Sequence, residues 1–241
     1  MLMRFFVPFL TLLFSFSSIA QELSGTELLE KAIAFHDPNR NWETFIADLK
    51  IIMKTPKSAD RLSLIHMDLS RELFILTVEK ENDLYTYELE KDSCTFSLNG
   101  SLTISDSDKK RLRLNCERGK MMKNYYTYLY GLPMKLKDPG TIINQEVEKR
   151  TFKEKQYLVL KVNYTKEVGE DTWYFYFDPH TYAMEVYQFF HDESKNDGEY
   201  ILLEGLENIH EIKMPKIRAW YYNKDDKYLG TDVLNFIPDM E

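Results

Sequence analysis

The spacing of apolar residues changes from helical to alternating early in the chain. Residues 25–36 carry apolar side chains at helical spacing, and Ser24 and Glu27 have the spacing of a capping box, so we expect a helix there. From Phe45 to Met53 apolar and polar residues alternate, which predicts a long strand with one buried face. Further short alternating runs predict an antiparallel meander over 61–68, 72–79, 83–90 and 94–104, the last interrupted by the hairpin dipeptide Asn99-Gly100.

The pattern returns to helical spacing in mid-chain. Residues 105–129 predict a helical insertion with a break near Gly119, and Gly131-Leu132-Pro133 ends it. A second set of strands is expected at 142–151, 156–165, 171–178, 181–190, 199–206, 211–223 and 228–236. No repeat or low-complexity linker divides the sequence, so we expect residues 21–241 to form a single domain. The expected fold class is α+β, with one large curved antiparallel sheet and helices on its concave face.

The densest apolar segment after the N-terminus is an expected aromatic hairpin, residues 173–190, with a turn at Asp178-Pro179. If Phe177 pairs with Tyr182, one face carries Trp173, Phe175, Phe177, Met184 and Val186, and the other carries Tyr174, Tyr176, Ala183, Glu185 and Tyr187. Neither face is plainly polar. Both are therefore covered to some degree, or one lines a cavity, and ordinary core packing is the favoured interpretation.

The N-terminus has the form of a secretory signal peptide over residues 1–20. Arg4 precedes an apolar run that is too short for a transmembrane helix, and small residues at Ser18 and Ala20 form a cleavage site. We expect cleavage after Ala20 and a mature protein that begins at Gln21. Since position 21 is not Cys, we expect no lipid anchor, and hence a soluble periplasmic or secreted protein.

The charge and composition of the chain limit the kinds of partner that we expect. The formal net charge is −8, and the lysines are scattered among acids, so we expect no nucleic-acid partner. Tyr and Phe are abundant, with 16 and 15 copies, which is typical of a sheet-rich domain.

Cys94 and Cys116 are the two cysteines of the chain, and disulfides persist in the expected compartment. A disulfide between them is the simplest interpretation. Two buried thiols are the main alternative, whereas a metal site has little support because no His lies nearby.

The sequence offers no catalytic constellation. The dipeptides His36-Asp37 and His191-Asp192 are half of the ligand set of metal-dependent phosphohydrolases, but the first closes a helix and the second ends a strand. We therefore expect no metal, no cofactor and no catalytic residue. The basic and apolar segment 135–140, bracketed by prolines, could lie near a cavity mouth, although a purely structural connection is favoured.

Two resemblances sharpen the expected fold. The order of the expected elements, with a late Met214-Pro215-Lys216, resembles the LolA-like fold of periplasmic lipoprotein carriers. Four blocks look like those of an uncharacterised family of secreted proteins, mainly from Bacteroidota: Tyr125–Pro133 (YYTYLYGLP), Lys135–Gly140 (KLKDPG), Gly198–Ile201 (GEYI) and Arg218–Tyr222 (RAWYY). The carrier resemblance implies an unclosed half-barrel whose concave apolar face is covered by helices and accepts acyl chains.

The resulting hypothesis is a soluble binding protein for an apolar or amphipathic ligand, a lipid or the acyl chains of a lipidated protein, without chemistry. Since an antiparallel sheet has one wet face, the apolar face of each strand should line the ligand site. The expected ligand residues are Phe45, Leu49, Ile51, Trp173, Phe175 and Met184, with Trp220 near the rim. Two alternatives stay open: a secreted hydrolase whose site assembles only in three dimensions, and an adapter that binds a cell-envelope protein.

Overall fold

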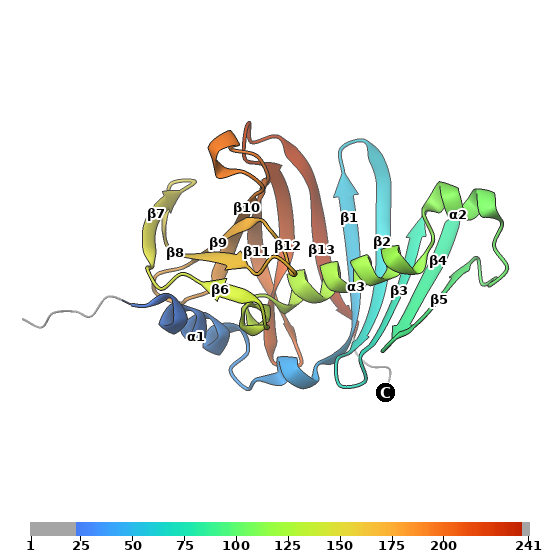
Figure 1. Cartoon of the computed structure of the whole chain (residues 1–241), viewed down its shortest axis with the longest axis horizontal. Coiled ribbons are helices and arrows are strands. Elements are labelled where there is room, and N and C mark those ends of the chain that lie inside the picture. Colours follow the sequence, from blue (N-terminus) through green and yellow to red (C-terminus); the bar gives the residue numbers. More distant parts are fainter. Residues whose placement is uncertain (1–22, 238–241) are drawn as a thin grey trace, which may run out of the picture.

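A computed structural model describes residues 23–237 of the chain. Within this range, one antiparallel sheet contains every strand (Figure 1). The first meander comprises β1 (Ile46–Thr55), β2 (Ser58–Asp68), β3 (Leu73–Lys80), β4 (Asp83–Glu90) and β5 (Ser93–Leu98). The second comprises β6 (Thr141–Ile143), β7 (Glu148–Phe152), β8 (Lys155–Tyr164), β9 (Thr172–Phe177), β10 (Met184–Phe190), β11 (Glu199–Ile209), β12 (Ile212–Tyr222) and β13 (Tyr228–Ile237).

The two meanders join where the first and last strands pair. β1 lies beside β13, with Ile51 opposite Leu234, and the strand order is β5-β4-β3-β2-β1-β13-β12-β11-β10-β9-β8-β6, while β7 pairs with the other part of β8. Within the described residues the end strands β5 and β6 do not pair with each other, so the sheet stays open. Figure 1 shows this sheet curving around the long helix α3 (Cys116–Gly131).

Helix α1 (Gly25–His36) begins at the expected capping box. The Ser24 hydroxyl accepts a hydrogen bond from the Glu27 amide, and the Glu27 carboxylate accepts one from the Ser24 amide at 2.8 Å. The helix lies against β8 and β12, with Leu28 and Ala32 fully buried. The remaining helical segments are α2 (Asp106–Leu112), η1 (Asn41–Thr44), η2 (Met134–Lys137) and η3 (Glu193–Lys195).

The break in the helical insertion lies earlier than expected. Arg113 adopts a left-handed conformation that ends α2, and the Asn115 side chain accepts a hydrogen bond from the Arg118 amide to begin α3. Gly119 lies inside α3, where a Cβ would come within 2.9 Å of the Tyr87 ring. This glycine therefore permits a close approach between helix and sheet, and the prediction of a break there was wrong.

Two expected strands are shorter than their patterns. Leu98 and Ser101 exchange backbone hydrogen bonds around the turn Asn99-Gly100, as expected, but the chain after Ser101 adds no strand. The run 142–151 is divided into β6 and β7. Between these strands the Gln145 carbonyl accepts a hydrogen bond from the Gly25 amide, which satisfies a donor at the start of α1.

The aromatic hairpin has a different register from the one expected. Phe177 pairs with Met184, and a bulge before Val186 then places Val186 opposite Tyr176 and Tyr187 opposite Phe175. The assignments of Met184, Phe175, Phe177 and Trp173 to one face hold. The assignments of Val186 and Tyr187 were wrong, because the extra residue exchanges the faces of everything that follows it.

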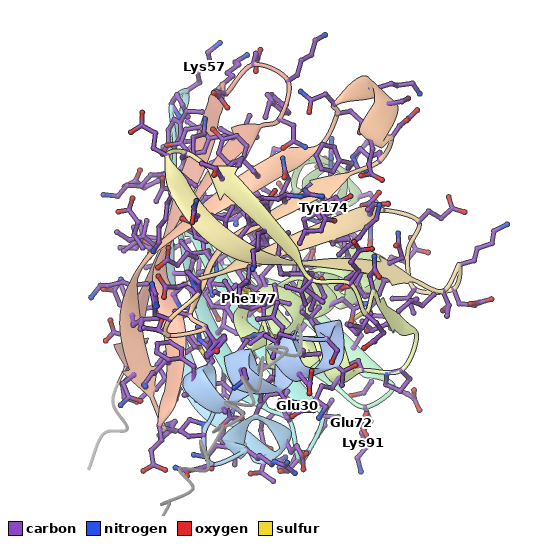
Figure 2. All side chains as sticks on the ribbon, turned by 90° about the vertical axis from the view of Figure 1, so that its left-hand side faces the viewer. Glu30, Lys57, Glu72, Lys91, Tyr174 and Phe177 are labelled. Carbon is purple, nitrogen blue, oxygen red and sulfur yellow. A yellow bond between two sulfur atoms is a disulfide. The ribbon has the colours of Figure 1, made fainter. Side chains whose placement is uncertain are left out.

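Both faces of this hairpin are covered. Phe177 is fully buried in the large core between the sheet and the helices, whereas Tyr174 belongs to a smaller outer cluster, covered in part by Phe152 of β7. Figure 2 labels Tyr174 and Phe177, which lie three residues apart on β9 and so face opposite sides of the sheet.

A disulfide joins Cys94 of β5 to Cys116 at the start of α3, with Cα atoms 5.9 Å apart, as expected. It attaches one end of the long helix to the edge of the sheet. The expected signal peptide and its cleavage site lie outside the described residues. Of the helices that are described, none has the length and apolar character needed to span a membrane.

Candidate functional site

Helix α3 presents two lines of tyrosines to the inside of the sheet. Tyr126 and Tyr130, four residues apart, are fully buried, and Tyr125 and Tyr128, three residues apart, are half-buried. Tyr126 packs on Phe74 of β3, with ring centroids 6.5 Å apart, and its hydroxyl lies 3.1 Å from that of Ser63. The first line holds the helix on the sheet, and the second leaves tyrosine rings partly accessible at its side.

A continuous series of aromatic rings runs beside the helix. Tyr128 contacts Tyr164 of β8 and Trp173 of β9, with centroids 6.3 and 5.5 Å apart. Trp173 contacts Tyr187 of β10 at 6.2 Å, and Tyr187 contacts Trp220 of β12 at 6.2 Å. Trp220 stacks on Tyr125 at 6.3 Å. We call this series the aromatic strip: Tyr164, Tyr128, Trp173, Tyr187, Trp220 and Tyr125.

An open pocket of about 530 Å³ lies at one end of the strip. Tyr128, Tyr164 and Trp173 form its aromatic wall, and Lys123 of α3 and Lys135 of η2 contribute ammonium groups. Lys135 forms an ion pair with Asp138, and Lys123 donates a hydrogen bond to the Glu72 carbonyl at 3.0 Å. The segment 135–140 thus helps to line a cavity mouth.

The aromatic wall stays uncharged at physiological pH. The hydroxyls of Tyr128 and Tyr164 are hydrogen-bonded at 2.5 Å. Burial raises the pKa of Tyr164 to about 12 and the pKa of Tyr128 well above its usual range. Apolar rings with neutral hydroxyls beside two lysines suit a ligand that has both an apolar and a polar part.

The expected ligand residues fall into two groups. Trp173 and Trp220 are half-buried members of the strip, and Phe175 lies under Trp173, with the rings nearly parallel and 6.0 Å apart. Phe45, Leu49, Ile51 and Met184 are buried in the core, away from this strip: Phe45 packs on Trp42 of η1, and the Met184 amide bonds to His36 of α1.

Sequence reasoning missed four members of the strip. The spacing of Tyr125 and Tyr128 in a predicted helix was a usable signal for the α3 part. Tyr187 was assigned to the outer face because the bulge in β10 was not foreseen. Tyr164 carried no signal, since only the pairing of β8 with β9 brings it near Tyr128.

The histidine-aspartate pairs have structural explanations. His36 lies buried between α1 and the sheet, and His191 contacts Asp171 at 2.6 Å on the surface. Hydrogen bonding to Asp171 raises the pKa of His191. Across residues 23–237, no three His, Cys, Asp or Glu side chains are grouped as metal ligands.

Comparison with known proteins places the chain in a family. A model described as a family of unknown function, DUF6503, matches residues 3–235. The chain belongs to this family. A comparison with curated protein sequences gives no match.

Solved structures agree on the fold. A LolA superfamily protein from Nitrosomonas europaea superposes with a TM-score of 0.50 and 12% identity, covering 91% of this chain and 96% of that one. A DUF1329 family protein from Desulfovibrio piger gives 0.51 and 8%, covering 90% and 94%. A domain described as outer membrane lipoprotein-sorting from Vibrio parahaemolyticus gives 0.49 and 12%, covering 90% and 95%. The resemblance to the LolA-like fold is confirmed, with a large antiparallel sheet that is not closed into a barrel.

Proposed function

We propose that this protein binds an apolar or amphipathic ligand, a lipid or the acyl chains of a lipidated protein, without chemical change. We place the protein outside the cytoplasm, soluble after cleavage following Ala20. The observation that carries the proposal is the pocket of about 530 Å³ at the Trp173 end of the aromatic strip, on the helix-covered face of a LolA-like sheet. Apart from the fully buried Tyr187, the rings of the strip are half-buried, and their exposed parts are apolar surface that an acyl chain can cover at low cost in protein rearrangement.

The test is direct binding of a fluorescent fatty acid to protein purified from periplasm, with mass spectrometry of whatever co-purifies. Trp173→Ala should weaken binding about tenfold, because it removes one wall of the pocket. Val168→Asp should also weaken it, by placing a carboxylate at the pocket; since Val168 is 57% exposed, the fold should tolerate the change.

A matched control lies on the outer face. Phe152 is a half-buried aromatic residue of β7 in the outer cluster, so Phe152→Ala should leave fatty-acid binding unchanged. Phe175→Asp and Met184→Asp test whether the acyl chain of the ligand reaches the core of the protein. If it does, these variants should bind the fatty acid poorly while circular dichroism shows that they are folded. A wild-type protein that binds no lipid refutes the proposal.

One observation favours a second candidate, the envelope adapter. Phe45, Leu49 and Ile51 are at most 2% exposed, so side chains of the protein itself fill this part of the inner face. An adapter would use its tyrosine-rich surface to bind an envelope protein and would retain no lipid through purification. For the hydrolase alternative, the described residues contain no group of three side chains that could hold a catalytic metal ion.

A further inference from the structure

A row of polar side chains crosses the inner face of the sheet beside the aromatic strip. Arg61 of β2 pairs with Met53 of β1, Met53 pairs with Asp232 of β13, and Asp232 pairs with Arg218 of β12. Directly paired residues share a face, so Arg61, Asp232 and Arg218 all point towards α3. Arg61 donates a hydrogen bond to the Tyr126 hydroxyl at 3.2 Å, and Arg218 donates one to the Leu129 carbonyl at 3.4 Å.

This row gathers the buried polar atoms that lack hydrogen-bond partners. In the part of the chain that the structure describes, every such side-chain atom belongs to one of six residues, the three of the row and three beside it. We call these six residues the cluster. The atoms are both carboxylate oxygens of Asp232, Nε of Arg61 and of Arg218, the hydroxyls of Tyr130 and Tyr187, and Nε1 of Trp220. Leaving such an atom without a partner is unfavourable, because it has lost its hydrogen bonds to water and gained none in the protein. The concentration of these atoms at one place indicates a binding site and not scattered packing faults.

The charges and the free hydrogen-bond donors of the cluster indicate which class of ligand it can bind. The row holds two guanidinium groups and one carboxylate, which leaves an excess of one positive charge when Asp232 is ionised and of two when it is protonated. Five donor groups lack partners, against the two oxygens of that single carboxylate. A cation would add to the existing positive excess. An anion rich in acceptors, such as a phosphate or a carboxylate, would neutralise it and accept the free N–H and O–H groups.

The cluster and the strip share two residues. Tyr187 and Trp220 contribute polar atoms to the cluster and rings to the strip, and the Arg218 guanidinium lies 3.9 Å from the centre of the Tyr130 ring. Arg61 and Trp220 are half-buried residues at the border of the row, although the atoms without partners are themselves covered, so a head group would enter as these two side chains move aside. A linear molecule with its charged end on the row would run its chain past Trp220 towards Trp173, over the fully buried ring of Tyr187.

We propose that Arg61, Arg218 and the surrounding hydroxyl and indole groups bind the anionic head, a phosphate or carboxylate, of the amphipathic ligand. This inference rests on the proposed function, because it assigns the ligand class of the same site. Asp232 opposes the bound anion and so limits its affinity, which would permit release.

The experiment compares 12-carbon probes, used below their micelle-forming concentrations, on the full mature protein. Calorimetry measures binding of laurate, dodecyl phosphate, uncharged monolaurin and cationic dodecyltrimethylammonium. The two anions should bind at least about tenfold more tightly than monolaurin, because charge-assisted hydrogen bonds are the strong ones. The cation should bind most weakly. Inorganic phosphate should compete only at much higher concentration than dodecyl phosphate; equal competition would overturn the assignment as a head-group site.

Two substitutions locate the preference. Arg61→Gln should abolish most of the preference for the two anionic probes over monolaurin. It should leave the binding of monolaurin itself unchanged, since Gln can still donate to the Tyr126 hydroxyl and hold the local structure. Asp232→Asn should strengthen the binding of both anions by removing the opposing charge. Arg150→Gln is the matched control and should have little effect, because Arg150 of β7 stacks on Tyr174 of the outer cluster. Lys123→Gln tests instead whether an ammonium group of the pocket holds the head.

The failures of the two proposals differ. If the wild type binds charged and uncharged probes equally, or if Lys123→Gln and not Arg61→Gln removes the preference, the head-group assignment is overturned while lipid binding stands. If no probe binds, both proposals fail.

Discussion

His36 of α1 accepts a hydrogen bond at Nε2 from the backbone amide of Met184, which lies 148 residues later in the chain, at 2.9 Å. Its Nδ1 lies 2.6 Å from the Lys213 carbonyl, so Nδ1 carries the proton and donates it. One fully buried imidazole thus joins α1 to β10 and β12. A second proton on Nε2 would face the Met184 N–H and break this link.

The link predicts acid sensitivity. Burial lowers the pKa of His36 from 6.5 to about 4. Because the unfolded chain binds this proton more readily, the stabilisation is complete above pH 6.5 and is lost as the pH falls towards 4. We expect the loss to reach about 3 kcal/mol by pH 4. The check is the free energy of unfolding of wild type and His36→Gln: their difference should shrink between pH 7 and pH 4, and a constant difference would contradict the prediction.

The Cys94–Cys116 disulfide should stabilise the protein. It closes a loop with a sequence separation of 22, for which the chain-entropy account gives about 3 kcal/mol. The double variant Cys94→Ser/Cys116→Ser should therefore unfold at lower denaturant concentration than the oxidised protein. Intact mass with and without reductant confirms the bond first; two thiols that alkylate in the native protein would rule it out.

Gly131 ends α3 against Trp42. A Cβ there would lie 2.2 Å from the indole and 2.6 Å from the Lys135 side chain. Although Ala is the better helix former by about 1 kcal/mol, we expect Gly131→Ala to destabilise by roughly 1–3 kcal/mol because buried Trp42 must move.

Gly169 is the matched control for Gly131, since no heavy atom lies within 4 Å of its added Cβ. Gly169→Ala should change stability by less than about 0.5 kcal/mol. Thermal melts of the two variants compare them, and equal shifts would show that the contact with Trp42 has no effect.

Buried Asp232 of the polar row lowers the stability of the ligand-free protein at neutral pH. Burial raises the pKa of this carboxyl, against the opposing attraction of Arg61 and Arg218. Its contribution to stability is therefore present below the unfolded pKa and is lost as the pH rises through the folded pKa. Asp232→Asn should stabilise the ligand-free protein at pH 7, by about 1 kcal/mol.

Exposed Asp226 is the control for Asp232. Its hydrogen bond from Lys153 lowers its pKa, so Asp226→Asn should bring no gain in stability. Chemical denaturation at pH 7 measures both variants, and a destabilised Asp232→Asn would show that the two arginines outweigh the burial.

Cleavage after Ala20 is checked by N-terminal sequencing of the exported protein. We expect Gln21 as its first residue. A different start, or retention of the protein in the membrane fraction, would contradict this expectation.

Features with short-range causes were predictable from the sequence. The capping box of α1, the alternation of β1 and the turn at Asn99-Gly100 depend on residues a few positions apart, and each lies where its pattern placed it. Two cysteines in one chain left a single possible pair. The fold followed from the order of these elements, since neighbouring strands pair and helices must cover an apolar face.

The tertiary structure decided what depends on distant contacts. The Met184 amide bonds to His36, and the bulge that follows reverses the faces of Val186 and Tyr187, a reversal that no local pattern records. From the sequence, Gly119 predicts a break in the helix. Only the packing of Tyr87 against this position shows that the glycine allows a close contact inside a continuous helix. The strip and the polar row draw residues from six strands and α3, and only the pairing of β1 with β13 brings Arg61 near Arg218. Sequence periodicity shows which face of a strand is buried, but not which strand lies beside it.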